Sequence, residues 1–160
     1  MKSNELEDFL DLNADYYFKK TKKIILKNRD IKVTYAIFMR RPVLFCPTLA
    51  INWINQVEKL RNTTFEIEMC YQEGDWVGAG EPLMFLSGKF STLVELETTY
   101  LQFIGPASVA AYNAYKMCVD MPETQFVAMD ARHCAGPKMH ELMAYGASVG
   151  SKRAKKELGA

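Results

Sequence analysis

Apolar side chains follow two different spacings in the first 71 residues. Residues 4–11 place them at helical spacing, whereas residues 63–71 alternate strictly between apolar and polar side chains, as in a half-buried strand. The stretch 32–40 is apolar on both alternating sets, which is typical of a strand covered on both faces. The pattern predicts helices at 4–11, 16–27 and 50–60, and strands at 32–40, 43–46 and 63–71.

Glycine and proline mark the turns in the middle of the chain. Residues 73–88 read as a turn, a short strand, a second turn and a longer strand, because the glycines there permit the positive φ values of tight connections. An apolar helix is predicted at 93–103. Gly105-Pro106 is expected to end it, since proline lacks a backbone donor and clashes with the preceding turn. A second helix, rich in small residues, is expected at 107–117.

The last part of the chain changes to a repeated order of elements. An apolar strand is predicted at 124–132, followed by a turn that ends at Gly136. A helix at 137–145, a link at 146–151 that can hold a brief strand, and a helix at 151–158 come next. This order is typical of the βα repeats that build a parallel sheet or a barrel.

The pattern as a whole predicts an α+β protein. A mixed, sandwich-like domain with a hammerhead-type turn is expected at residues 1–110, and the first βα units of an incomplete α/β barrel at 111–160. A βα piece of this size cannot close a barrel or cover a parallel sheet on both faces. The chain is therefore either a fragment or the partner of a chain that supplies the remainder.

Composition narrows the class of protein. Twenty basic and 19 acidic residues leave a net charge of +1, so no global electrostatic case for nucleic acid or membrane follows. The four cysteines form no C-x-x-C pair and only two histidines are present, so no zinc site is expected. Without a signal peptide or a run of roughly 18 apolar residues, the expected location is the cytoplasm. A basic run at 19–29 predicts a solvated helix face, with a phosphate-facing patch as the alternative.

One motif lies at residues 74–83, where the order Gly-Asp-x-Val-x-x-Gly-x-x-Leu occurs. It resembles the hammerhead turn of biotinyl and lipoyl carrier domains, and the same pattern occurs in the N-terminal domain of type II phosphoribosyltransferases. Its architectural interpretation is a tight turn that pairs two strands. A carrier domain also needs a lysine at a hairpin tip. Lys89 follows a glycine but lacks the flanking residues of those domains, so the carrier interpretation is the weaker alternative.

A second motif is the aromatic cluster Asp15-Tyr16-Tyr17-Phe18-x-x-Thr21. It resembles the Asp-x-Tyr-Phe-x-x-Thr element of nicotinate phosphoribosyltransferases, and the resemblance implies that Tyr17 packs on the pyridine ring of the substrate. An aromatic neighbour contributes about 0.5–1.5 kcal/mol beyond area burial. The alternative is a cluster that only anchors its helix to the core.

A third motif, Leu93-x-x-x-Glu97-Thr98-x-x-Leu101, resembles the Leu-x-x-x-Glu-Thr-x-x-Leu helix of the same family. Quinolinate enzymes carry Glu-Arg at the Glu97-Thr98 position, and that arginine helps to bind the second carboxylate of their substrate. The resemblance therefore implies that Thr98 favours a pyridine with one carboxylate. An ordinary, partly exposed helix pair is the alternative.

The fourth motif is Asp130-Ala-Arg132-His133, which lies where the family carries Phe-Gly-x-Arg-Arg or Asp-Thr-Arg-Lys. Arginine offers a fixed, bidentate donor pair to carboxylates and phosphates, so Arg132 and His133 are implied to hold anionic groups. His133 replaces a basic residue, and its charge near neutral pH depends on its surroundings. The alternative is an exposed pair without a ligand.

The order of the four motifs resembles the N-terminal part of a nicotinate phosphoribosyltransferase. The resemblance implies transfer of phosphoribose from 5-phosphoribosyl 1-diphosphate to nicotinate, as a step of NAD synthesis, with Mg²⁺ and ATP as cofactors. It also implies a homodimer, or a complementary barrel chain, in which Tyr17 acts on the other subunit's site. The substrate-binding candidates are Tyr17, Thr98, Arg132 and His133; no catalytic residue is assigned. The chain alone is expected to be inactive, and a non-catalytic binding or assembly module on the same fold is the alternative function.

Overall fold

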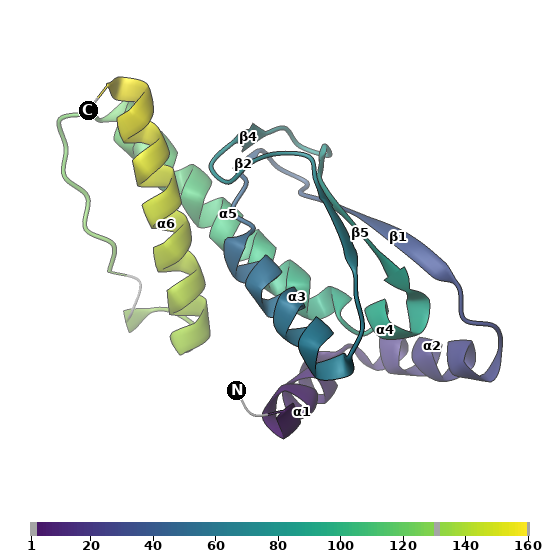
Figure 1. Cartoon of the computed structure of the whole chain (residues 1–160). Helices are drawn as coiled ribbons and strands as arrows, with labels where there is room; N and C mark the ends of the chain where they lie inside the picture. The colour runs from purple at the N-terminus through teal and green to yellow at the C-terminus, as the bar shows by residue number, and fades with distance from the viewer. Residues whose placement is uncertain (1–2, 130–131, 160) are drawn as a thin grey trace.

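The computed structural model describes residues 3–129 and 132–159, and it confirms the predicted α+β class. Helices and strands follow one another along the chain as shown in Figure 1. The elements are α1 (Ser3–Asn13), α2 (Tyr16–Lys27), β1 (Lys32–Phe38), β2 (Val43–Leu44), α3 (Thr48–Arg61), β3 (Glu66–Met69), β4 (Trp76–Val77), β5 (Pro82–Lys89), α4 (Phe90–Leu93), α5 (Glu97–Asp120) and α6 (Pro137–Leu158). Within the described residues, no helix is both long and apolar enough to span a membrane.

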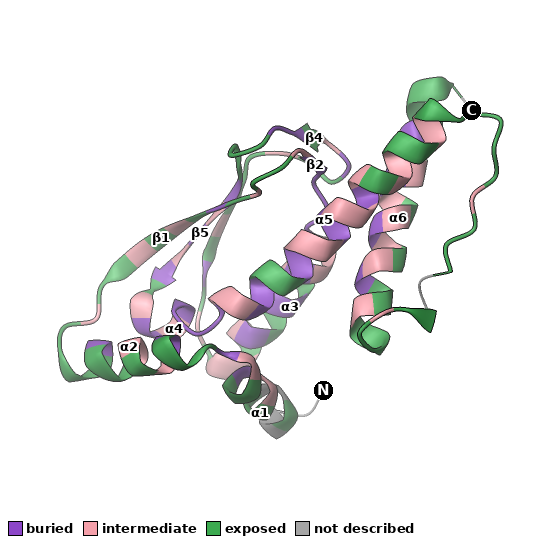
Figure 2. Ribbon diagram, turned by 180° about the vertical axis from the view of Figure 1, so that it is seen from behind, coloured by how far each residue is buried: buried purple, intermediate pink, exposed green. Residues whose placement is uncertain are grey.

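A three-stranded antiparallel sheet in the order β1-β5-β3 forms one layer of the domain. Buried side chains of β1 and β5, such as Ile37 and Leu86, share one core with the buried residues of α3 and α5. The opposite face of the sheet is open (Figure 2), and Thr34 and Ala36 on β1 are exposed there. The prediction of a strand covered on both faces is therefore wrong, because the helices cover only one side.

The glycine-rich segment forms the expected tight turn. β2 pairs with β4, and the Gly74 and Phe45 N–H groups donate hydrogen bonds of 2.8 Å to the carbonyls of Phe45 and Asp75 respectively. Gly74 and Gly80 adopt φ values of 87° and 81°, which residues other than glycine rarely adopt. Lys89 ends β5 and leads directly into α4, so it does not lie at a hairpin tip. This position does not support the carrier interpretation.

Helix α5 does not end at Pro106. It runs without interruption for 24 residues, so the predicted second helix at 107–117 is part of the same helix. Gly105 explains the tolerance, because a residue without Cβ removes part of the crowding that proline imposes on its predecessor. The predicted division between 1–110 and 111–160 thus falls inside α5.

Helix α6 packs closely along α5 (Figure 1). A Cβ added to Gly146 or Gly150 would overlap the backbone carbonyl of Ala107 or Ala111, respectively. These glycines are four residues apart and lie on one helix face. The brief strand considered at 146–151 is therefore wrong. The small residues serve a close helix contact, and 137–158 is one helix.

The predicted strand at 124–132 is absent from the described part of that segment, residues 124–129 and 132. Its apolar side chains find no neighbouring strand: Val127 is 81% exposed and Met129 is 54% exposed. A lone strand leaves its backbone groups unpaired, so the apolar pattern is not sufficient to form one. Asp130 and Ala131, part of the fourth motif, lie outside the described residues.

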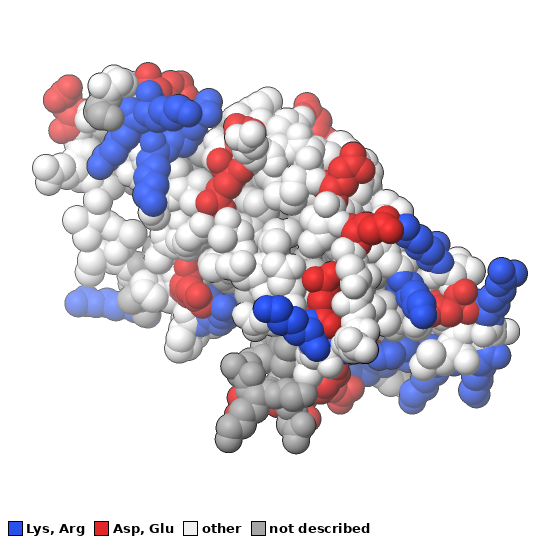
Figure 3. Space-filling view, viewed as in Figure 1, with Lys and Arg blue, Asp and Glu red and all other residues white. Residues whose placement is uncertain are grey.

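Helices α1 and α2 form a unit at the N-terminal edge of the domain, which we call the arm. Leu10 of α1 reaches the main core, whereas Phe18 and Ile25 of α2 pack in a small separate cluster with Val94. Lysine side chains of α2 project outward, and Figure 3 shows a second basic group at the end of α6. The predicted solvated helix face is confirmed for Lys20, Lys23 and Lys27 of this helix, all of which are exposed.

Candidate functional site

The start of α2 meets the start of α5 through Asp15 and Thr98. The Thr98 hydroxyl donates a hydrogen bond of 3.1 Å to Asp15 Oδ2 across 83 residues of sequence. Asp15 occupies the N-cap position of α2 but makes no side-chain capping bond to that helix. Aspartate usually caps at this position. Its carboxylate therefore joins two helices instead of capping one.

Tyr17 lies in the first turn of α2, next to this contact. Its ring is 56% exposed, whereas that of Phe18 is buried, and the two ring centroids are 4.1 Å apart. The Thr21 hydroxyl donates a 2.9 Å hydrogen bond to the Tyr17 carbonyl. Phe18 thus anchors the turn, and Tyr17 presents an accessible aromatic ring. The position of Phe18 agrees with a cluster that anchors the helix, whereas the exposed ring of Tyr17 is available for binding.

Carboxylates and further tyrosines surround this end of α5. Partial desolvation and the charges of Asp15 and Glu97 raise the pKa of the Tyr17 phenol, so the ring stays neutral at physiological pH. Burial, followed by the charge of Asp15, raises the pKa of Glu97. Burial and Glu97 also raise the pKa values of Tyr35 and Tyr100. The result is an aromatic, acidic corner with two carboxylates close enough to influence one another.

Arg132 and His133 lie elsewhere. Both are exposed in the connection between α5 and α6, where the Arg132 N–H donates a hydrogen bond of 3.5 Å to the Met129 carbonyl. Figures 1 and 2 place this connection and α2 at opposite sides of the molecule. The structure therefore brings Tyr17 and Thr98 together within one chain, and it does not bring Arg132 and His133 to them.

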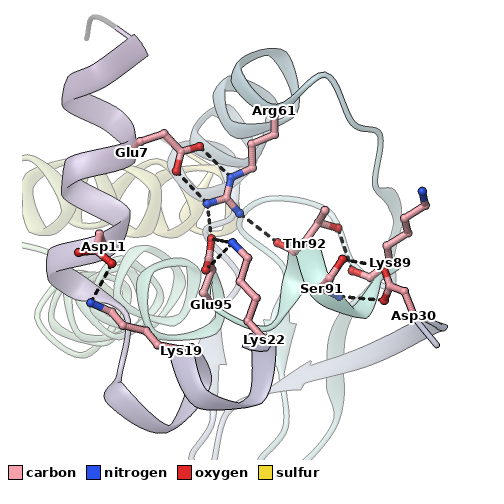
Figure 4. A network of polar contacts seen from close by, with 10 residues as sticks. All are labelled: Glu7, Asp11, Lys19, Lys22, Asp30, Arg61, Lys89, Ser91, Thr92 and Glu95. Atoms are coloured by element: carbon pink, nitrogen blue, oxygen red, sulfur yellow. Dashed lines mark hydrogen bonds and ion pairs between the residues drawn. The ribbon is translucent and has the colours of Figure 1, made fainter. Parts of the chain in front are cut away.

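A network of exposed and partly buried charges joins the arm to the rest of the domain (Figure 4), and no sequence motif indicates it. Lys22 of α2 donates hydrogen bonds of 2.7 and 2.8 Å to the two carboxylate oxygens of Glu95. Arg61, at the end of α3, also bonds Glu95 and donates at 3.0 and 3.1 Å to Glu7 of α1. A lysine on a helix and an arginine at a helix end are common in sequences, so only the fold reveals their convergence.

The described residues contain no group of three or more His, Cys, Asp or Glu side chains that could hold a metal ion. The donor set of the described residues thus does not fit a resident metal. A shallow hollow of about 470 Å³ lies on the open face of the sheet, between Thr34, Glu68 and Phe85. Neither Tyr17 nor Thr98 lines it, so the hollow is separate from the aromatic corner.

Solved structures with the same fold include two nicotinate-nucleotide pyrophosphorylases and a nicotinic acid phosphoribosyltransferase. The chain is similar to the nicotinate-nucleotide pyrophosphorylase of Pyrococcus furiosus, with a TM-score of 0.74, 21% identity, and coverage of 94% of this chain and 38% of that one. The corresponding protein of Francisella tularensis gives 0.68, 20%, 92% and 50%. Human nicotinic acid phosphoribosyltransferase gives 0.67, 17%, 89% and 37%. The chain thus spans half or less of the length of these three proteins, and the similarity defines the fold.

The sequence itself identifies the family. Residues 15–108 match the family described as quinolinate phosphoribosyl transferase, N-terminal domain. The chain belongs to this family. A search of curated proteins found no match. The resemblance to type II phosphoribosyltransferases is thereby confirmed at the level of the family, and the matched range includes Asp15, Tyr17 and Thr98 but not Arg132 or His133.

Proposed function

We propose that this chain supplies the pyridine-binding side of a phosphoribosyltransferase that acts on nicotinate in NAD synthesis. The observation that carries the proposal is the exposed ring of Tyr17 beside the Asp15–Thr98 hydrogen bond. A neutral phenol ring next to an open surface can stack on an electron-poor pyridine. Thr98 carries no positive charge for a second carboxylate, and this favours nicotinate over quinolinate.

The reaction needs little covalent help from the protein. The pyridine nitrogen forms a bond to the anomeric carbon of 5-phosphoribosyl 1-diphosphate, while the bond from that carbon to the diphosphate oxygen breaks and diphosphate leaves. The ring nitrogen becomes positively charged in this step. The carboxylates of Asp15 and Glu97 lie on the side of Tyr17 and favour positive charge on a ring stacked there. Tyr17 orients the pyridine ring, and holding the two substrates close together lowers the reaction barrier further.

The site is proposed to be completed by a second chain. Arg132 and His133 suit the anionic groups of the substrates, yet they belong to the α5–α6 connection, which lies on the other side of the molecule from α2. A homodimer that brings Tyr17 of one copy toward Arg132 of the other would unite both halves, as would a complementary barrel chain. Mg²⁺ and ATP are part of this proposal, as cofactors that bind together with the phosphorylated substrate.

Calorimetry with nicotinate tests the proposal. Binding heat is expected for the assembled protein, and it should be lost in Tyr17→Ala and Arg132→Ala. Tyr16→Ala is a matched control, because Tyr16 is the adjacent tyrosine, is 72% exposed and packs under Lys20. Equal loss in Tyr16→Ala and Tyr17→Ala would contradict a specific role for Tyr17.

The same titration separates the proposal from a non-catalytic assembly module. The position of the α5–α6 connection, away from α2, is the observation that favours such a module. Absence of nicotinate heat, together with a stable complex between copies, would favour the module. Formation of nicotinate mononucleotide by the assembled protein, with none from a dilute monomeric sample, would favour the transferase.

A further inference from the structure

The arm carries Asp15 and Tyr17, and among its described side chains Leu10 alone belongs to the main core. Its second helix packs through Phe18 and Ile25 in a cluster that is separate from the main core. A helix that is held by so few apolar contacts is free to change its orientation. Something else must therefore fix the direction in which α2 presents Tyr17.

The Glu7–Arg61–Glu95–Lys22 network is suited to that task. Each helix of the arm contributes one charged side chain, Glu7 from α1 and Lys22 from α2, and each of these pairs with a residue of the domain body. Arg61 and Glu95 are themselves paired, and their side chains are only 10% and 12% exposed. Both arm helices are thus bonded to one ion pair of the body.

Charge balance within the network is complete, with two cations and two anions. The hydrogen bond from Arg61 lowers the pKa of Glu7, with burial opposing. Burial acts to lower the pKa of Arg61, but its bonds to Glu7 and Glu95 outweigh it and raise that pKa. Arg61 also donates to the Thr92 carbonyl at 3.3 Å, which fixes the plane of its guanidinium. Glu7 and Arg61 therefore stay charged at neutral pH, and Glu95 joins Arg61 to Lys22 by hydrogen bonds to both.

A network of this type is better explained by orientation than by stability. Desolvation offsets much of the attraction in a buried ion pair, and apolar replacements are often as stable. A planar guanidinium and a carboxylate with two bonded partners, in contrast, define directions as well as distances. The second ion pair of α2, from Lys19 to Asp11 at 3.0 Å, lies entirely within the arm and does not bond it to the body.

We propose that Glu95 and Arg61 are positioning residues that hold the arm in one orientation and thereby place Tyr17 and Asp15 against Thr98 and Glu97. They act through Lys22 and Glu7 and do not touch the substrate. The inference rests on the proposed function only for the identity of what Tyr17 binds. The arrangement of Tyr17 relative to α5 can be tested without any substrate.

The test follows the titration of the Tyr17 phenol by ¹⁹F NMR in protein labelled with fluorotyrosine, with the resonance assigned through Tyr17→Phe. The variants are Lys22→Met, Glu95→Gln and, as a matched control on the same helix, Lys19→Met. If the arm loses its orientation, Tyr17 leaves Glu97 and its partly buried position, so its pKa falls in both Lys22→Met and Glu95→Gln. A direct effect of charge has a different signature, because removing a cation raises a phenol pKa and removing an anion lowers it.

Lys22→Met therefore decides the matter even if Glu95→Gln fails to fold. A lower Tyr17 pKa in Lys22→Met, with an unchanged or higher one in Lys19→Met, supports the proposal. A Tyr17 pKa that rises or stays the same in Lys22→Met overturns it. Limited trypsin digestion gives a second readout, since the lysines of α2 should be cleaved several-fold faster in Lys22→Met than in Lys19→Met; equal rates count against the proposal.

Addition of nicotinate distinguishes this inference from the proposed function. If nicotinate does not change the ¹⁹F chemical shift of Tyr17 in the assembled wild-type protein, nicotinate is not the ligand and the proposed function is overturned. The response of the same resonance to Lys22→Met is independent of that result. Each idea can thus fail while the other stands.

Discussion

Tyr145 and Glu73 are 72 residues apart in the sequence, and the Tyr145 hydroxyl donates a 2.9 Å hydrogen bond to Glu73 Oε1. The other carboxylate oxygen of Glu73 accepts bonds from the backbone N–H and the hydroxyl of Thr48, the first residue of α3. One exposed glutamate at the tight turn therefore joins α6 to the beginning of α3. The tight turn therefore has a structural role through Glu73 as well as through its glycines.

Replacing Glu73 should weaken both connections. Glu73→Ala removes the acceptor at the α3 N-terminus together with the partner of Tyr145, and the expected loss is about 0.5–2 kcal/mol in the free energy of unfolding. Denaturant unfolding checks this value. Glu68→Ala, at an exposed glutamate on β3, serves as the control. Equal stability of the two variants would show that the Glu73 bonds contribute nothing.

The contact between α5 and α6 should be sensitive to a single methyl group. Gly150→Ala places a Cβ against the Ala111 carbonyl, and the helices must move apart. The expected cost is about 1–3 kcal/mol, because backbone offers no flexible end that can yield. Ser148→Ala, at an exposed position of the same helix, should change stability little. Thermal unfolding of the two variants provides the comparison.

Exposed cysteines should react with thiol reagents in the native protein, and buried ones should not. Burial, followed by the charge of Glu73, raises the pKa of the Cys46 thiol to about 12, whereas Cys70 is exposed. Only the thiolate reacts. A thiol reagent at neutral pH should therefore modify Cys70 in the native protein and Cys46 only after unfolding, as peptide mass mapping can show. Native modification of Cys46 would contradict the packing around β2.

Substrate choice should depend on Asp15 as much as on Thr98. An arginine introduced at position 98 would meet the Asp15 carboxylate, which now accepts the Thr98 hydrogen bond. Thr98→Arg alone should therefore gain little affinity for quinolinate. The double variant Thr98→Arg/Asp15→Asn frees the guanidinium, and quinolinate affinity should rise about tenfold, which corresponds to about 1.4 kcal/mol. Calorimetry with nicotinate and quinolinate measures both, and a gain in the single variant would argue against this role of Asp15.

Acid should weaken the attachment of the arm. The pKa of Glu7 is lowered below its ordinary value of 4.5 in the folded state. Its contribution to stability is therefore present above that ordinary value and is lost as the pH falls through the lowered one. Glu97 has a raised pKa and behaves oppositely, because its protonation favours the folded state. Protection of the α1 amides against hydrogen exchange, corrected for the intrinsic effect of pH on the exchange rate, should fall from neutral to acid pH in the wild type. It should change less in Glu7→Gln, which has already lost the charge.

Local patterns along the sequence predict most of the N-terminal elements. The helical spacing near the N-terminus, the alternation at 63–71 and the glycines of the tight turn all have counterparts in α1, β3 and the β2–β4 pair. These features depend on neighbours in sequence. The errors arise where distant parts decide the outcome. Gly105 permits Pro106 within a helix, and Gly146 and Gly150 serve a helix contact that no local signal distinguishes from a turn.

The candidate site divides in the same way. Tyr17 and Thr98 are recognisable from motifs, and the fold places both beside Asp15. Asp15 belongs to a motif, but its bond to Thr98 depends on the packing of the arm. Arg61 and Glu95 have no signal in the sequence, because their value comes from four charges that converge from four parts of the chain. The segment at 124–132 shows the opposite case: its apolar pattern is strong, but its described residues form no strand because none lies beside them to pair with.

Helix α5 begins at the aromatic corner and ends where the connection to Arg132 begins. Its 24 residues span about 36 Å at 1.5 Å per residue. The insertion of one residue would lengthen this span slightly but would turn one end by about 100° relative to the other. Exposed side chains of α5 can therefore vary without effect on this alignment, whereas a change in its length would misalign its two ends relative to one another. Insertions and deletions are expected to be rarer in this helix than in the connection that follows it.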